Sequence, residues 1–197
     1  SPVQFGQVSR PGDIKYKDLN HDGVIDSNDQ APIGYNPVPE MTFSLAAGMN
    51  WKGFDFSILL QGAARSSIYL QQDIAWDNFW GNYYEEHIGR WTPETAATAT
   101  YPRFTKAATA AHPNYYKSDY WLKDSKYLRL KNIQLGYTIP RKLLKKFGVR
   151  SLRVYANAYN LFTWDNVKKV DPESSNNSNG QFYPQQKVIN FGINLNF

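Results

Sequence analysis

The chain has 197 residues, no cysteine and a formal net charge of +5, so disulfides, thiolate metal sites and a cysteine nucleophile are excluded. The basic residues are scattered apart from a group within 141–146, and without a basic stripe we expect no nucleic-acid partner. No stretch approaches the ~20 apolar residues of a membrane-spanning helix, whereas strands that alternate lipid-facing and water-facing residues are compatible with this composition.

Residues 1–40 are polar and turn-rich, and they contain an acidic loop between Asp18 and Asp29. Its Asp-x-Asn-x-Asp-Gly spacing is typical of an EF-hand calcium loop, which surrounds Ca²⁺ with oxygen ligands. The candidate ligands are Asp18, Asn20, Asp22, the Val24 carbonyl, Asp26 and Asp29. The alternative is an exposed Asn/Asp/Gly turn that binds no metal, and no flanking helix pattern decides between the two.

Residues 41–63 show the period-two alternation of a two-faced β-strand, first over 41–51 and again over 54–62. Lys52-Gly53 between them predicts a two-residue hairpin turn, in which Trp51 and Phe54 are direct partners on one face. That face is apolar, and the other consists of small and polar residues with Leu59 as an exception.

Residues 64–125 form a long connection rich in aromatic residues, and connections of this length are usually functional or have structure of their own. The candidates for ligand binding are Trp76, Trp80, Tyr83, Tyr84 and Trp91. Such rings could stack on sugars or pack against a partner protein, where aromatic residues dominate the energetics. Alternatively, they fold the loop onto itself or form an interfacial girdle.

Residues 126–197 predict three more strands, over 126–139, 151–164 and 187–197. The apolar phase slips near Lys131-Asn132, which predicts a β-bulge. After Pro140, residues 141–147 predict one or two helical turns closed by Gly148. The segment 165–186 is a polar loop, and the final strand alternates up to Phe197.

Together these patterns predict an all-β fold, namely the C-terminal strands of a large transmembrane antiparallel β-barrel with long extracellular loops. The short connections 52–53 and 140–150 are expected on the periplasmic side, and the longer segments outside. Five strands would leave unpaired edges in lipid, so further strands must come from residues N-terminal to Ser1 or from another chain. Residue 1 begins no signal peptide, which led us to interpret the chain as a fragment.

A family resemblance rests on several motifs in order along the chain. The segment 12–26 reads GDIKYKDLNHDGVID and is similar to the GDIKYKDxNGDGxID segment of SusC/RagA-type, TonB-dependent outer-membrane transporters, with His21 in place of the usual glycine. The family order continues with WKGFDFS at 51–57, LQG at 60–62, RWTPE at 90–94, YPR at 101–103, YLRLKNI at 127–133, LGY at 135–137, NLFT at 160–163 and DPE at 171–173.

The resemblance implies a nutrient importer of the Gram-negative, Bacteroidetes-type outer membrane rather than an enzyme. Its expected partners are the N-terminal remainder of the barrel with its plug, a SusD-like surface lipoprotein, the TonB complex, and an oligosaccharide or peptide substrate. The alternative function is a soluble secreted β-rich glycan-binding module with a calcium-stabilised loop. A hydrolase is a distant third, because no nucleophile motif is present and the histidines are far apart in sequence.

Overall fold

The computed structural model describes residues 3–77, 83–106, 111–168, 170–174 and 183–197. The chain divides into two compact units. The first combines residues up to 34 with 68–123, and the second combines 35–67, 124–173 and 183–197. In the described part of the chain, no helix is long and apolar enough to cross a bilayer.

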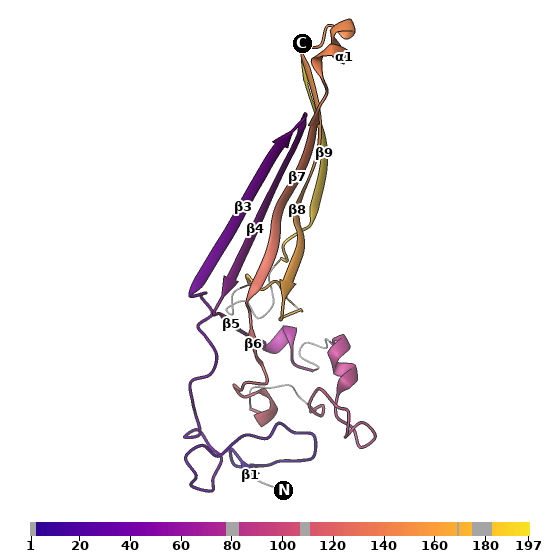
Figure 1. Cartoon of the computed structure of the whole chain (residues 1–197). Helices are drawn as coiled ribbons and strands as arrows, with labels where there is room; N and C mark the ends of the chain where they lie inside the picture. The colour runs from indigo at the N-terminus through magenta and orange to yellow at the C-terminus, as the bar shows by residue number, and fades with distance from the viewer. Residues whose placement is uncertain (1–2, 78–82, 107–110, 169, 175–182) are drawn as a thin grey trace. The chain divides into compact units, whose positions relative to one another are not determined.

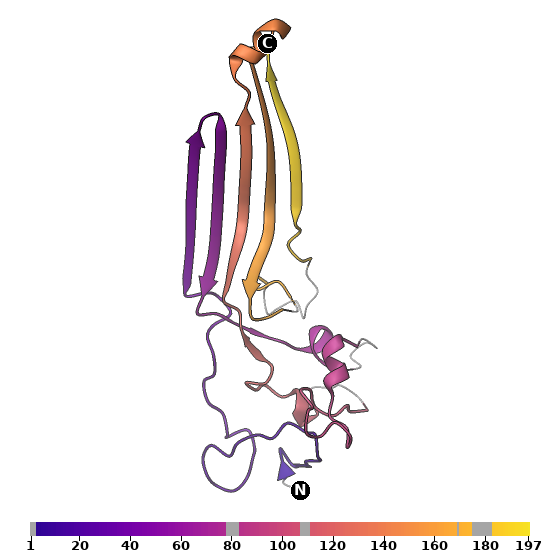
Figure 2. The same ribbon diagram turned by 45° about the vertical axis from the view of Figure 1, so that its right-hand side comes forward.

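The second unit is a single antiparallel sheet of five long strands in the order β3-β4-β7-β8-β9 (Figure 1). The strands are β3 Met41–Trp51, β4 Phe54–Ala64, β7 Tyr127–Thr138, β8 Ser151–Asp165 and β9 Val188–Asn196. Each strand coincides with one of the five predicted strands to within two residues, so the all-β prediction is confirmed. Figure 2 shows the strands side by side, with β3 and β9 at opposite edges.

The β3–β4 connection is the predicted two-residue hairpin. Lys52 and Gly53 have φ angles of 48° and 90°, and positive φ at both central residues is the mark of a type I′ turn, whose twist matches that of the flanking strands. Trp51 pairs with Phe54, and the register continues without a shift to Met41 and Ala64.

The predicted bulge lies in β7, where the register against β4 shifts between Leu59 and Leu60 and leaves Lys131 without a directly opposed residue. The β7–β8 register shifts at the same level, and on β8 Asn160 has a φ of 50°. An unmatched one-residue slip would turn all following side chains to the other face. The extra residues therefore keep the apolar set of each strand on the same side of the sheet.

The β7–β8 connection contains the helical turns that the sequence predicted. Helix α1 spans Arg141–Leu144 and the 3-10 helix η4 spans Lys145–Phe147. Gly148 closes them in the left-handed region with a φ of 71°, as a C-terminal cap requires.

The first unit is built from short elements, which the alternation of apolar and polar residues does not predict. They are the paired strands β1 Val3–Gln4 and β2 Gln7–Val8, and the 3-10 helices η1 Gln72–Ile74, η2 Glu85–Gly89 and η3 Pro113–Tyr115. Strands β5 Ser67–Tyr69 and β6 Leu122–Asp124 form a further two-stranded pair. The core of this unit is aromatic, with Trp76, Tyr101, Tyr115 and Trp121 all buried.

Candidate functional site: the two faces of the five-stranded sheet

One face of the sheet is apolar across all five strands. The register places Leu45, Leu60, Leu130 and Phe162 in one continuous row. Towards the C-terminal edge, Ala156 pairs with Phe191. Leu130 is buried, but most of this face is not sealed in a core, because Phe191 is 84% exposed and other large apolar residues of the face, such as Leu45 and Phe162, are also exposed. Monomers rarely expose a contiguous apolar surface of this extent to water.

Aromatic side chains bound this apolar face at both ends. At one end the register aligns Trp51, Phe54 and Tyr137, and the Phe54 and Tyr137 ring centroids are 4.5 Å apart. At the other end the row from Phe43 reaches Trp164. Phe43 and Trp51 are eight residues apart on β3, which is about 27 Å along an antiparallel strand. With a barrel tilt of roughly 40°, this gives a height near 21 Å, similar to the ~25 Å apolar band of outer-membrane barrels.

The opposite face is polar and carries an ion pair that crosses the central strand. Arg153 on β8 donates from Nε to Asp55 Oδ1 on β4 at 2.9 Å and from Nη2 to Asp55 Oδ2. Strand β7 lies between these two strands, and it presents Gly136 beneath the pair. A Cβ at Gly136 would lie 2.5 Å from both Arg153 Nη2 and Asp55 Oδ1, so the bridge depends on the missing side chain.

Hydrogen bonds between amide side chains continue this polar face towards β9. Asn190 donates to Asn157 Oδ1 at 3.0 Å, and Asn196 donates to the Ser151 hydroxyl at 2.7 Å. A face of this chemistry is suited to water, whereas the other face is suited to hydrocarbon.

A second charged cluster lies on the polar face. It links β7 to residues 171–173, which follow β8. Arg129 is 1% exposed. Its Nη2 donates to Asp171 Oδ1 at 2.8 Å, its Nε donates to the Thr163 hydroxyl at 3.0 Å, and its Nη1 lies 3.3 Å from Glu173 Oε2. Arg129 belongs to the motif YLRLKNI and the two carboxylates to DPE, and nothing in these motifs predicts that they meet. Arg129 and Asp171 are 42 positions apart in the sequence, so only the fold reveals this cluster.

The acidic loop 18–29 is tied together by carboxylates that accept backbone N–H groups. Asp18 accepts from His21 and Gly23, and Asp22 accepts from Val24. Asp29 accepts from Asp26, Leu19 and Asn20. Among the described residues, no group of three or more His, Asp or Glu side chains gathers as metal ligands would. The oxygen donors that Ca²⁺ prefers are present, but in this structure they accept hydrogen bonds within the loop.

These hydrogen bonds favour the charged form of Asp29. The backbone N–H groups, that of Asp26 first, hold the pKa of the Asp29 carboxyl below its ordinary value of 3.8. Because the folded pKa is lowered, the resulting stabilisation is present above that ordinary value and is lost as the pH falls through the lowered pKa.

The aromatic residues singled out as ligand-binding candidates have different environments. Trp76 is 4% exposed and packs on Tyr115 with ring centroids 4.9 Å apart, so its ring belongs to the core of the first unit. Trp91 is partly buried and covers Gly12, where a Cβ would lie 2.5 Å from the indole ring. Tyr83 and Tyr84 are exposed. Trp80 lies outside the described residues.

Asp77 is a buried carboxylate in the core of the first unit, which the sequence did not predict. Asp77 is buried and accepts hydrogen bonds from the Tyr115 and Tyr101 hydroxyls and from the Thr105 backbone N–H. Burial raises the pKa of both tyrosines, so the phenols remain donors. Only the fold shows that the Asp77 oxygens accept hydrogen bonds inside an aromatic core.

An antiparallel sheet with a lipid-compatible face, aromatic margins and an ion-paired polar face defines the class of transmembrane β-barrel walls. The comparisons with known proteins agree with this class. The chain is 30% identical over 203 residues to TonB-dependent receptor P26 of Formosa agariphila, covering 94% of the chain and 20% of that receptor. It is 27% identical over 195 residues to TonB-dependent receptor SusC of Bacteroides thetaiotaomicron, covering 98% of the chain and 18% of that receptor.

Solved structures show the same fold. The RagAB peptide importer in its open-open state matches 87% of the chain and 19% of the importer chain, with a TM-score of 0.65 and 23% identity. A second RagAB peptide transporter structure matches 85% of the chain and 19% of its own, with a TM-score of 0.64 and 24% identity. No protein-family model matches the chain. The chain is similar over nearly its whole length to TonB-dependent receptors, SusC among them, and it spans about a fifth of the length of the relatives it matches.

Proposed function

We propose that the chain forms the C-terminal part of the barrel wall of a TonB-dependent outer-membrane importer, which takes up glycans or peptides with a SusD-like lipoprotein. The observation that carries the proposal is the contrast between the two faces of one sheet. The face that contains Leu45 and Phe191 is exposed and apolar, and the face that contains Asp55 and Arg153 is polar and ion-paired. In the described part of the chain β3 and β9 each pair along one edge only, and lipid would require partners for the other edge.

The connections suggest how this wall is oriented. The hairpin turn at 52–53 and the connection 139–150 lie at one end of the sheet, because Thr138 N–H donates to the Gly53 carbonyl. Short turns face the periplasm in outer-membrane barrels, and the longer connections face outwards. On this orientation the segment 64–125 lies outside, where the exposed Tyr83 and Tyr84 are available to contact substrate or the lipoprotein. Coupling to TonB is assigned to the N-terminal remainder of the importer.

The exposed apolar face bears on the competing function. A soluble glycan-binding module would need to bury the apolar face of its sheet, because that burial is the main favourable term in folding. The structure leaves this face exposed over all five strands, including the β9 residues Phe191 and Ile193. The soluble module is therefore the weaker candidate.

Paired cysteine labels on β3 test the proposal. Leu45 and Ser44 are consecutive residues of β3 and point to opposite faces. In the full-length importer in lipid bilayers, with any other cysteines replaced, L45C should react with a lipid-soluble maleimide and S44C with a water-soluble one. Equal reaction of both positions with the water-soluble reagent would contradict a barrel wall.

A further inference from the structure

The connection between β7 and β8 is larger than a tight turn requires and exposes two large apolar side chains. The β3–β4 strands are joined by two residues, whereas residues 139–150 join β7 to β8. Within this connection Leu144 is buried, but Leu143 is 65% exposed and Phe147 is 76% exposed. Leu143 lies in α1, and Phe147 is the last residue of η4, which follows directly.

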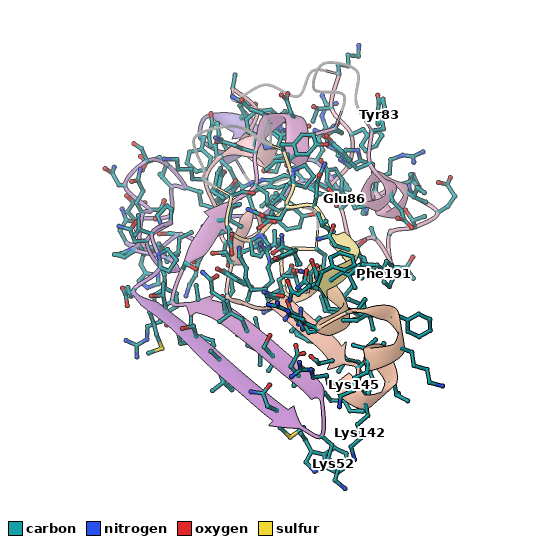
Figure 3. All side chains as sticks on the ribbon, turned by 90° about the horizontal axis from the view of Figure 1, so that it is seen from above. Lys52, Tyr83, Glu86, Lys142, Lys145 and Phe191 are labelled. Atoms are coloured by element: carbon teal, nitrogen blue, oxygen red, sulfur yellow. The ribbon has the colours of Figure 1, made fainter. Side chains whose placement is uncertain are left out.

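The same connection is strongly basic. Four cations of its helical turns, Arg141, Lys142, Lys145 and Lys146, are exposed, as is Arg150 after them. Lys52 in the β3–β4 turn belongs to the same end of the sheet, because the Thr138 N–H donates to the Gly53 carbonyl; Figure 3 labels Lys52, Lys142 and Lys145. We call these six residues the basic rim.

Little negative charge opposes the basic rim. Between Lys126 and Trp164 the sequence contains no Asp or Glu. The acidic side chain nearest this end in the described part of the second unit is Asp55, which Arg153 already engages. The rim therefore carries uncompensated positive charge beside exposed apolar side chains, a combination that favours the boundary between anionic headgroups and acyl chains.

The rim is continuous with the apolar face of the sheet. Lys52 Nζ lies 4.9 Å from the centroid of the Trp51 ring, and Trp51 belongs to the aromatic row that bounds the apolar face. A lysine above an interfacial tryptophan has its stem in the apolar zone and its ammonium group at headgroup level. The basic rim thus begins where the proposed membrane-facing surface ends.

Resting on the proposed function, we infer that the connection 139–150 and Lys52 form an interfacial anchor that binds anionic phospholipid at this end of the barrel. The phosphodiester groups pair with the basic rim, and Leu143 and Phe147 enter the acyl-chain boundary. Together with the aromatic row, the anchor fixes the depth at which the barrel strands sit in the membrane.

Lipid retention by charge-neutralised importers tests the anchor. The full-length importer is reconstituted in nanodiscs of phosphatidylethanolamine with phosphatidylglycerol, re-extracted, and its retained lipid is measured by mass spectrometry. Because each basic residue near an anionic surface contributes about 1 kcal/mol, the loss of three lysines in K142Q/K145Q/K146Q should lower phosphatidylglycerol retention roughly a hundredfold. The variant K15Q/K17Q/K117Q removes the same charge from exposed lysines of the first unit and should retain the wild-type amount.

A depth probe separates failure of the anchor from failure of the barrel. A fluorophore at F147C should be quenched by lipid-attached quenchers in the same nanodiscs, and a fluorophore at L45C serves as the reference for the wall. Quenching at L45C without quenching at F147C, or phosphatidylglycerol retention that does not change in K142Q/K145Q/K146Q, would overturn the anchor and leave the wall intact. Absence of quenching at L45C would overturn the proposed function itself.

Discussion

Gly136 has no side chain, and this leaves room for the Asp55–Arg153 ion pair to pass over β7. The Asp55–Arg153 pair joins β4 to β8 above β7, and a Cβ at Gly136 would lie 2.5 Å from atoms of both partners. Gly136→Ala should displace the pair and cost about 1–3 kcal/mol through overpacking. The measurement is urea unfolding of the full-length importer in lipid vesicles.

Gly48 provides the matched control on the same polar face. A Cβ there would meet the Phe56 carbonyl oxygen at 3.5 Å, which is an ordinary contact. Gly48→Ala should therefore leave the unfolding free energy almost unchanged. Equal effects of the two substitutions would show that the bridge above Gly136 is unimportant for stability.

Arg129 is a buried cation between two carboxylates, and its loss should be costly. Arg129→Met keeps side-chain bulk but leaves Asp171 without its 2.8 Å partner. Removing one member of a buried ion pair costs about 3–5 kcal/mol, which thermal unfolding of the importer should detect. Lys126→Gln breaks an exposed pair with Asp124 and should cost less than about 1 kcal/mol; a smaller effect at Arg129 than at Lys126 would contradict the prediction.

Calcium binding by the acidic loop stays a prediction. Calorimetry of the importer should detect Ca²⁺ uptake at millimolar or lower concentration, since EF-hand loops of extracellular modules bind in the ~10⁻⁴–10⁻³ M range. Asp29→Asn should weaken this uptake, because it removes the charge at loop position 12, whereas Asp119→Asn outside the loop should not. Uptake that is absent, or equal in both variants, would leave the loop as a turn held by its own hydrogen bonds.

At the scale of the element, β9 shows the clearest division between a face suited to lipid and a face suited to water. Phe191 and Asn190 are neighbours on β9 and face opposite sides, with Phe191 84% exposed. Phe191→Arg should destabilise the importer in bilayers, by an amount that depends on depth and reaches about 2–4 kcal/mol for a cation on the lipid face at the midplane. Asn190→Arg faces water and should change stability by less than about 1 kcal/mol. Folding titrations in vesicles measure both, and equal tolerance would argue against a lipid-facing strand.

At the scale of the whole molecule, the exposed apolar face predicts how the isolated chain behaves. Without lipid or partner strands, this face is an association surface and the sheet edges are open. Light scattering after size exclusion should therefore show aggregates in plain buffer and detergent-bound particles in detergent. A soluble monomer with cooperative melting in plain buffer would instead support the glycan-binding module.

The sequence alone determined the five long strands, the two-residue turn at 52–53, the bulge near Lys131 and the apolar face. These features are local, because successive side chains of a strand point to opposite faces, and their polarity indicates whether each face contacts lipid or water. Contacts between distant segments were decided only by the tertiary structure: the Asp55–Arg153 bridge above Gly136, the Arg129–Asp171 pair and the burial of Trp76 and Asp77. Alternation cannot predict them, because it specifies the face of a residue and leaves open which strand or loop lies opposite.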